Sequence, residues 1–375
     1  MTLLLASLLT ASAQDLDEAV GQAPEAVDLS GAVFSGDAII NGSEYSEDEY
    51  PMAGAMLMSI TIPNLGGISS FACSSTLIAP DVVLIAAHCV DKDFLEQSIT
   101  GGVIDLDSLG AEILFYWSRQ ADLSDYNGSS FTGDVPPDAI EVTATASHPD
   151  FDFDQINSLG GLGVNDNNDI ALMFLSEAVE DVPHAYLPTA DEATQLEEGS
   201  IVEIVGWGYQ QPHSGQPSGP FAIKVGGESV IGELGDYEFQ VGPEEDDARK
   251  CNGDSGGPTF MDVETNASDS LRVIGVTSHA YDTTLCATKG GVDTRVDAFL
   301  EWIDDEMTGA CDDGTRVWCD GETGIIEAPT PVSNNNSGDD DKNGRAGCSA
   351  VAASSGALIA GLSLLVSVSR RRRDG

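Results

Sequence analysis

The 375-residue sequence predicts an all-β fold, an antiparallel barrel or sandwich, with one helix at the end of the folded region. Between Ile39 and about Met307, short β-type runs alternate with stretches rich in Gly, Pro, Asn and Asp, as in strands joined by turns. A later segment carries its apolar residues at helical spacing instead. The hydrophobic content of 41% is enough for a sizeable core.

The clearest strand signals follow one another along this region. They are AGAMLMSITI (53–62), DVVLIAAHCV (81–90), IALMFL (170–175), SIVEIVGWG (200–208) and RVIGVTS (272–278). The segment from about Gly101 to His148 gives few such signals, and we expect extended surface loops there. A helix is predicted over residues 296–307, since apolar residues recur on one face that packs on the barrel: Val296, Phe299, Leu300, Ile303 and Met307.

The charge of the chain argues against nucleic acid as a partner. The 63 acidic and 15 basic residues give a formal net charge of −48, and such a field repels phosphates. A solvated acidic surface is favoured over a dedicated cation site. The acidic stretch NDNND (165–169) lacks the spaced ligands of an EF-hand loop, so neither a metal nor another cofactor is predicted.

The first 38 residues resemble targeting and processing segments. Residues 1–13 are predicted to be a signal peptide cleaved before Gln14, because a short apolar run ends in Ala-Ser-Ala. The run lacks a basic start, so an upstream start or a buried first strand stays open. Residues 14–38 are acidic, contain no Lys or Arg, and are predicted to form a pro-segment.

The C-terminal region is predicted to comprise a Cys loop with a flexible linker (309–347) and a sorting or membrane tail (348–375). Residues 350–369 are mostly small or apolar, and as a helix they would span roughly 30 Å, a bilayer core. Arginines at 370–373 would hold that end in the cytoplasm. The Gly-Cys pair, apolar helix and arginine cluster resemble the MYXO-CTERM sorting tails of myxobacterial surface proteins.

The MYXO-CTERM resemblance implies that Cys348 is a processing or lipid-attachment point and that sorting machinery handles the tail. The alternative is an unpaired thiol with no role. The chain has seven cysteines, so one remains without an internal partner if the others pair.

Three short motifs can supply a nucleophilic site. They place His88 in IAAHCV, Asp169 in NNDIALMFL and Ser255 in CNGDSGGP. A serine hydroxyl needs a base within hydrogen-bond reach, and that base needs an orienting carboxylate. Each residue alone is more often structural, but together they provide a nucleophile, a base and an orienting carboxylate.

These motifs resemble the trypsin and chymotrypsin family of serine proteases. The resemblance runs from Ile39 to about Met307 and includes IING at Ile39, AAHC, NNDIAL, GWG at 206–208, GDSGGP and the closing helix. It implies two β-barrels with a C-terminal helix, and serine endopeptidase activity on protein or peptide substrates. His88 would be the general base and then acid, Asp169 its orienting carboxylate, and Ser255 the nucleophile. The backbone N–H groups of Gly253 and Ser255 would form the oxyanion hole.

The resemblance also implies two disulfides, Cys73 with Cys89 and Cys251 with Cys286. Cys311 with Cys319 would lie outside the family pattern. Two bridges common in vertebrate members have no cysteines here, which fits a bacterial relative.

Zymogen activation is implied as well, over a peptidase domain of residues 39–308. A cut before Ile39 would free an ammonium group to pair with buried Asp254 and order the oxyanion hole. Ala38 precedes the cut, so the activating protease is predicted to favour small residues.

In this family the residue six before the nucleophile lies on the floor of the S1 pocket, which here is Arg249, with Ser278, Ala280 and Gly291 around it. A basic floor argues against Lys or Arg specificity. One hypothesis is a preference for acidic P1 residues through Arg249 or Lys250. The alternative is that Arg249 is neutralised by Asp293 or turns to solvent among residues 244–247. His279 replaces the usual Trp and is predicted to be a wall residue rather than a second base.

The sequence thus predicts an exported or surface-attached serine endopeptidase without Lys/Arg specificity. Two alternatives remain: a protease-like surface binding module that has lost catalysis, and an esterase with the same triad. The complete triad counts against the first, and the trypsin-type landmarks count against the second.

Overall fold

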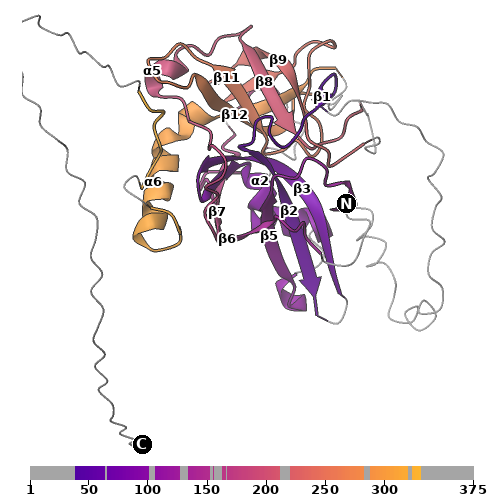
Figure 1. The fold of residues 1–375 in the computed structure, drawn as a ribbon. Coiled ribbons are helices and arrows are strands. Elements are labelled where there is room, and N and C mark those ends of the chain that lie inside the picture. Colours follow the sequence, from indigo (N-terminus) through magenta and orange to yellow (C-terminus); the bar gives the residue numbers. More distant parts are fainter. Residues whose placement is uncertain are drawn as a thin grey trace, which may run out of the picture. The chain divides into compact units, whose positions relative to one another are not determined.

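A computed structural model describes residues 39–63, 66–100, 106–126, 134–152, 155, 163–165, 167–211, 220–282, 288–319 and 323–330. These residues lie in one compact unit built on two antiparallel β-barrels, with a helix near the end (Figure 1). The predicted two-barrel fold with a closing helix is confirmed. The predicted signal peptide, pro-segment and sorting tail lie outside the described residues. Within the described ranges, no helix is long and apolar enough to cross a bilayer.

The first barrel closes in the strand order β2-β3-β4-β7-β6-β5. Its strands are β2 (Ala53–Ile62), β3 (Gly66–Ala79), β4 (Val82–Ile85), β5 (Glu112–Ser118), β6 (Ile140–Ser147) and β7 (Ala171–Leu175). Every residue of β4 and β7 is buried. Short helices α2 (Ala87–Val90) and α3 (Lys92–Thr100) follow β4, with 3₁₀ turns at Asp107–Leu109 and Ser124–Tyr126.

Strands β5 and β6 correct the expectation of surface loops between about Gly101 and His148. β6 consists largely of Thr, Ala and Ser and buries only one residue, so it shows no apolar run. β5 is apolar and aromatic through its centre without alternation, and most of it is only partly buried. The two strands were missed for different reasons: β5 does not alternate, whereas β6 does alternate apolar and polar residues, but its apolar set is half alanine, so this period-2 signal is weak and was overlooked.

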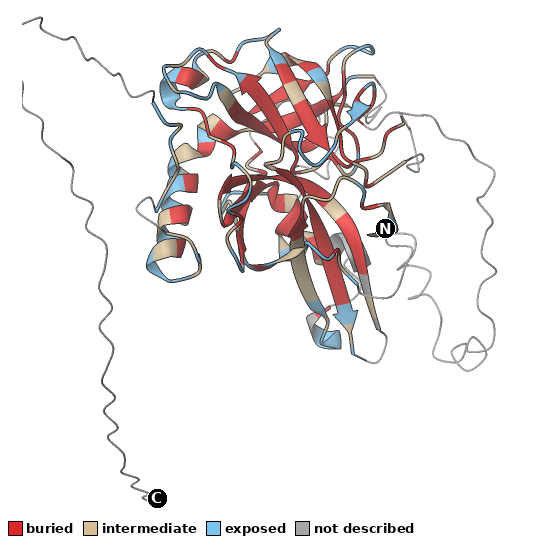
Figure 2. Ribbon diagram, viewed as in Figure 1, coloured by how far each residue is buried: buried red, intermediate tan, exposed pale blue. Residues whose placement is uncertain are grey.

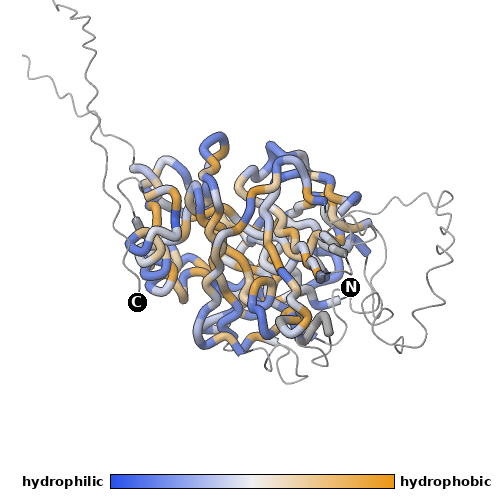
Figure 3. Tube along the Cα trace, turned by 90° about the horizontal axis from the view of Figure 1, so that it is seen from below, coloured by the Kyte–Doolittle hydropathy of each residue, from blue (hydrophilic) through white to orange (hydrophobic). Residues whose placement is uncertain are grey.

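The second barrel contains β8 (Ile201–Gly206), β9 (Val225–Leu234), β10 (Glu238–Val241), β11 (Pro258–Asp262), β12 (Leu271–Ala280) and β13 (Gly291–Arg295). Its order is β1-β9-β10-β13-β12-β11-β8, where β1 (Ser43–Glu44) adds an edge and a β8–β9 pairing closes the barrel. Helix α5 (Ala190–Ala193) precedes β8. The strands of both barrels carry most of the buried residues (Figure 2), and the hydrophobic segments concentrate in their interior (Figure 3).

The closing helix is longer than predicted. A 3₁₀ turn (Val296–Phe299) leads into α6 (Leu300–Asp312), which buries Ile303 and Met307. Beyond it, Ile325 donates its N–H to the Asp304 carboxylate at 2.9 Å, and Ser268 donates its N–H to the Pro329 carbonyl at 2.8 Å. The described residues 323–330, predicted as the start of a flexible linker, are thus held against the peptidase unit.

Candidate active site

His88 and Asp169 are brought together by the pairing of β4 with β7. His88 lies in α2, directly after β4, and Asp169 lies just before β7, whose Ala171 pairs with Ile85. His88 Nδ1 lies 2.7 Å from Asp169 Oδ2, and the His88 backbone N–H donates to Asp169 Oδ1 at 2.9 Å. Two contacts to one carboxylate fix the orientation of the imidazole.

Asp169 is completely buried and is also held by Ser278. The Ser278 hydroxyl donates to Asp169 Oδ2 at 2.6 Å. Burial opposes ionisation, but the His88 charge and the hydrogen bonds from His88 and Ser278 hold the pKa of the Asp169 carboxyl below its usual value. Ser278 was expected only to line the pocket, and no spacing in the sequence indicates its contact with Asp169.

Ser255 lies in the loop before β11 and is anchored to β3 by Ser74. The Ser74 N–H donates to the Ser255 carbonyl at 2.8 Å, and the Ser74 hydroxyl donates to the Gly253 carbonyl at 3.1 Å. Its neighbour Cys73 forms a disulfide with Cys89, next to His88. The nucleophile loop and the histidine helix are therefore fastened to the same point of β3, a role of Ser74 that the sequence did not reveal.

The predicted oxyanion hole requires glycine at position 253. Gly253 has φ +99°, and a Cβ there would lie 2.8 Å from a ring carbon of Phe221. The neighbouring N–H groups of Asp254, Gly256 and Gly257 all donate to backbone carbonyls. Among the described residues, the N–H groups of Gly253 and Ser255 donate to no other group, so they remain available for an oxyanion.

Asp254 is a fully buried carboxylate beside the nucleophile. It accepts hydrogen bonds from the Gly208 N–H at 2.8 Å and the Cys251 N–H at 2.7 Å. Burial raises the pKa of Asp254 to about 6, although these two bonds oppose the shift. Among the residues that the structure describes, Asp254 forms no ion pair, although the Lys250 charge also opposes the rise in its pKa.

Ile39, the predicted N-terminus after activation, packs among buried residues of the second barrel. Ile39 is fully buried and has φ +40°. The next residue, Ile40, exchanges backbone hydrogen bonds of 3.0 and 2.9 Å with Arg249. This isolated bridge places Ile40 beside the segment that leads to the nucleophile loop.

The predicted pocket residues Ala280 and Gly291 face each other across the β12–β13 pair. Asp293 is not the partner of Arg249, because it forms a buried ion pair with Lys250 at 2.7 Å. Nor does Arg249 turn to solvent: it is 3% exposed and donates from Nη1 to the Glu244 carbonyl at 2.9 Å. The version that pairs Arg249 with Asp293 was wrong, and the other was right about the loop at residues 244–247 but wrong about exposure to solvent.

His279 has a carboxylate partner that the sequence did not indicate. Its Nε2 lies 3.2 Å from Glu238 Oε1, and the Asn165 N–H donates to Glu238 Oε2 at 2.7 Å. Burial lowers the pKa of His279, but the Glu238 contact outweighs it and the pKa lies above its usual value.

The cysteines of the described residues are paired. Cys73–Cys89 and Cys311–Cys319 are disulfides, and Cys251 is disulfide-bonded. Its predicted partner Cys286, like Cys348, lies outside the described residues.

Comparison with known proteins identifies the family. A family profile described as Trypsin matches residues 39–303. The chain is 26% identical over 293 residues to melanization protease 1 of Drosophila melanogaster, covering 72% of this chain and 66% of that protein. It is 29% identical over 290 residues to the CLIP domain-containing serine protease HP8 of Bombyx mori, covering 72% and 70%. It is 28% identical over 303 residues to the Spaetzle-processing enzyme of Drosophila melanogaster, covering 75% and 68%.

These relatives are insect proteins, so they lend no support to the predicted bacterial source. The matched range contains both barrels and the predicted site residues His88, Asp169 and Ser255. The chain therefore belongs to the trypsin family of serine proteases.

Proposed function

We propose that this serine protease is an exported or surface-attached endopeptidase that cleaves peptide bonds through an acyl-enzyme on Ser255, with His88 and Asp169 as its partners. The observation that carries the proposal is the contact at 2.7 Å between the partly exposed His88 and the buried Asp169, with the Ser255 loop fastened to the same strand as the His88 helix. Disulfides in the described residues fit an oxidising compartment.

The geometry supports the following sequence of steps. With Nδ1–H held by Asp169, the Nε2 of His88 is the nitrogen that accepts the Ser255 proton as the hydroxyl attacks the scissile carbonyl. The N–H groups of Gly253 and Ser255 stabilise the oxyanion. The imidazolium then protonates the leaving amine, and water repeats the attack on the acyl-enzyme.

Activation by a cut before Ile39 is part of the proposal. A β-branched residue with φ +40° is strained. The φ angle of Ile39 is defined by the carbonyl carbon of residue 38, to which its nitrogen is bonded. Cutting this bond removes the constraint and creates an ammonium group on a segment that is already buried. Asp254, whose burial is poorly compensated, is the carboxylate suited to receive it.

The pocket supports the absence of Lys/Arg specificity. A cationic P1 side chain needs a free carboxylate, but Asp293 is already paired with Lys250. Attachment to the cell surface through Cys348 and the tail, and the sorting machinery this implies, rest on the sequence alone.

The test is peptide hydrolysis by protein that begins at Ile39, assayed beside its Ser255→Ala and His88→Ala variants. We expect hydrolysis in the parent and a loss of several orders of magnitude in both variants. A Ser270→Ala variant, which alters an exposed hydroxyl, is the matched control and should behave like the parent. Absence of hydrolysis in the parent would favour the surface binding module instead.

A further inference from the structure

Lys250 has no donor left for a substrate. Its side chain is 1% exposed, and an ammonium group has three N–H donors. Nζ lies 2.7 Å from Asp293 Oδ2, 2.7 Å from Thr259 Oγ1 and 3.5 Å from the Gly257 carbonyl. An acidic P1 side chain would find this charge already matched by Asp293.

The stem of Lys250 lies along the wall of the predicted pocket. A Cβ placed on Gly291 would lie 3.9 Å from Lys250 Cβ and 3.3 Å from the His279 carbonyl. Gly291 and Asp293 are two residues apart on β13, so they share one face of the strand. The Lys250 side chain therefore extends from Gly291 to Asp293. It occupies the bottom of the pocket, which the glycine would otherwise leave open.

Arg249 is directed to a different neighbour. Its Nη1 donates to the Glu244 carbonyl, and its backbone is tied to Ile40. Burial lowers the pKa of Arg249, and the charges that oppose this shift belong to Glu245, Asp247 and Asp246. The guanidinium is thus oriented toward the acidic loop at residues 244–247 rather than toward the Lys250–Asp293 pair.

We propose that the S1 pocket is shallow and electrically neutral, that it selects small uncharged P1 residues such as Ala, and that one substrate is a second copy of this chain, cut between Ala38 and Ile39. This inference rests on the proposed function. The step is a hydrolysis: the amide bond breaks, and water supplies the hydroxyl for the Ala38 carboxyl group and the proton for the Ile39 amine. An active molecule thereby activates further copies of its precursor, once the buried Ile39 end of such a copy has left the barrel.

A P1-scanning peptide series tests the pocket, using protein that begins at Ile39. We expect the highest kcat/KM with Ala at P1, and values at least about 10-fold lower with Glu, Lys and Phe. A maximum at Asp or Glu would overturn the inference and make Arg249 the selector. A maximum at Lys, Arg or a large apolar residue would overturn it as well.

A double variant, Lys250→Ser with Asp293→Ser, tests whether the ion pair makes the pocket shallow. Removing both charges avoids the unpaired buried ion that either single variant would leave. We expect the optimum to move toward longer side chains, with the Leu-to-Ala ratio of kcat/KM rising about 10-fold or more. An unchanged ratio in a folded, active double variant would show that the ion pair does not set the depth.

The precursor test uses the full chain carrying Ser255→Ala as substrate and a small amount of active protein. We expect a new N-terminus at Ile39 by sequencing, and no such cut when the substrate also carries Ala38→Lys. Peptide hydrolysis without cutting of the precursor would overturn self-activation and leave the endopeptidase intact. If no peptide is hydrolysed, the proposed function itself fails.

Discussion

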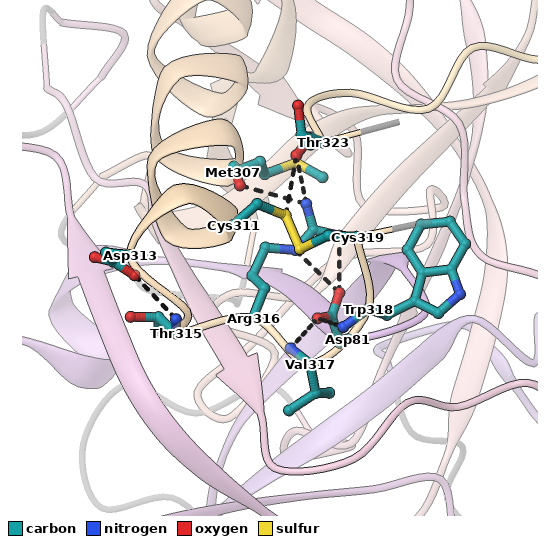
Figure 4. Close-up of a disulfide and its surroundings, with 10 residues drawn as sticks. All are labelled: Asp81, Met307, Cys311, Asp313, Thr315, Arg316, Val317, Trp318, Cys319 and Thr323. Atoms are coloured by element: carbon teal, nitrogen blue, oxygen red, sulfur yellow. Dashed lines mark hydrogen bonds and ion pairs between the residues drawn. A yellow bond between two sulfur atoms is a disulfide. The ribbon is translucent and has the colours of Figure 1, made fainter. Parts of the chain in front are cut away.

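Arg316, in the segment after α6, forms a fully buried ion pair with Asp81 in the turn between β3 and β4 (Figure 4). Arg316 Nη2 and Nε donate to Asp81 Oδ1 at 2.8 and 3.1 Å, while the N–H groups of Val317 and Trp318 donate to Oδ2 at 2.9 and 2.8 Å. The Cys311–Cys319 disulfide closes this loop. The C-terminal segment is thereby fastened to the strand pair that leads to His88.

Replacing Arg316 by Met should lower the free energy of unfolding by about 3–5 kcal/mol, because Asp81 would be left as an unpaired buried charge. Chemical denaturation of the two proteins measures the difference. Arg119→Met is the matched control, since Arg119 pairs at 3.4 Å with Asp181, which is 76% exposed. That change should lower the free energy by less than about 1 kcal/mol. Equal losses in both variants would contradict the structural role of the buried pair.

Ser278→Ala should lower kcat/KM about 10- to 100-fold, because a hydrogen bond to a charged acceptor contributes about 1.5–3 kcal/mol. The lost bond is the 2.6 Å contact that holds Asp169 ionised and in place. Steady-state kinetics on one peptide gives the ratio. Restoration of activity by Ser278→Thr, which keeps the hydroxyl, would distinguish positioning of Asp169 from a general loss of packing. Full activity in the Ala variant would show that His88 alone suffices to orient the carboxylate.

Gly253→Ala should reduce kcat about 10²- to 10³-fold, the usual effect of losing one oxyanion donor. The new Cβ would meet Phe221 at 2.8 Å and Gly208 Cα at 2.9 Å, so the backbone must shift. Gly199→Ala is the control, because Gly199 has φ +86° but no atom within 4 Å of its Cβ position. It shares the backbone strain without the crowding and should keep its kcat. Similar activities of the two variants would argue against an oxyanion role for Gly253.

The intact chain should lose stability through Asp254 as the pH rises. Its pKa is about 6 in the folded state, above the ordinary 3.8, so the folded state binds this proton more tightly than the unfolded state. The contribution is complete below the unfolded pKa and is lost as the pH rises through the folded pKa. Between about pH 4.5 and about pH 7 it should lower the free energy of unfolding by about 2 kcal/mol.

Denaturation of the intact Ser255→Ala chain at both pH values measures this loss. The same chain with Asp254→Asn should not show this pH-dependent loss of stability. A cut before Ile39 should also remove the loss, because the new ammonium group would lower the pKa of Asp254. An identical pH dependence with and without the Asp254 carboxyl would exclude the effect.

Most of the fold was predictable because its signals are local. Buried strands such as β4 and β7 appear as apolar runs, and the amphipathic spacing of residues 296–307 indicated the closing helix. β5 was missed because its apolar run does not alternate, and β6 because its alternating residues are mostly Ala and Thr, so the contrast between its two faces is weak.

For the candidate site, the residue types and motifs were enough to predict which chemical groups the chain carries and which turns present His88, Asp169 and Ser255. Which side chains pair became evident only from the folded chain: Lys250 with Asp293, Ser278 with Asp169, and Asp81 with Arg316 across 235 residues. The sequence alone does not distinguish the roles of the two neighbouring basic residues, Arg249 and Lys250. Their side chains leave the backbone in different directions, so one reaches a buried carboxylate and the other a loop carbonyl. These partners meet only when the barrels close, and a buried charge is stable only where an opposite charge or a hydrogen bond compensates it. Neither condition can be inferred from residues that are adjacent in the sequence.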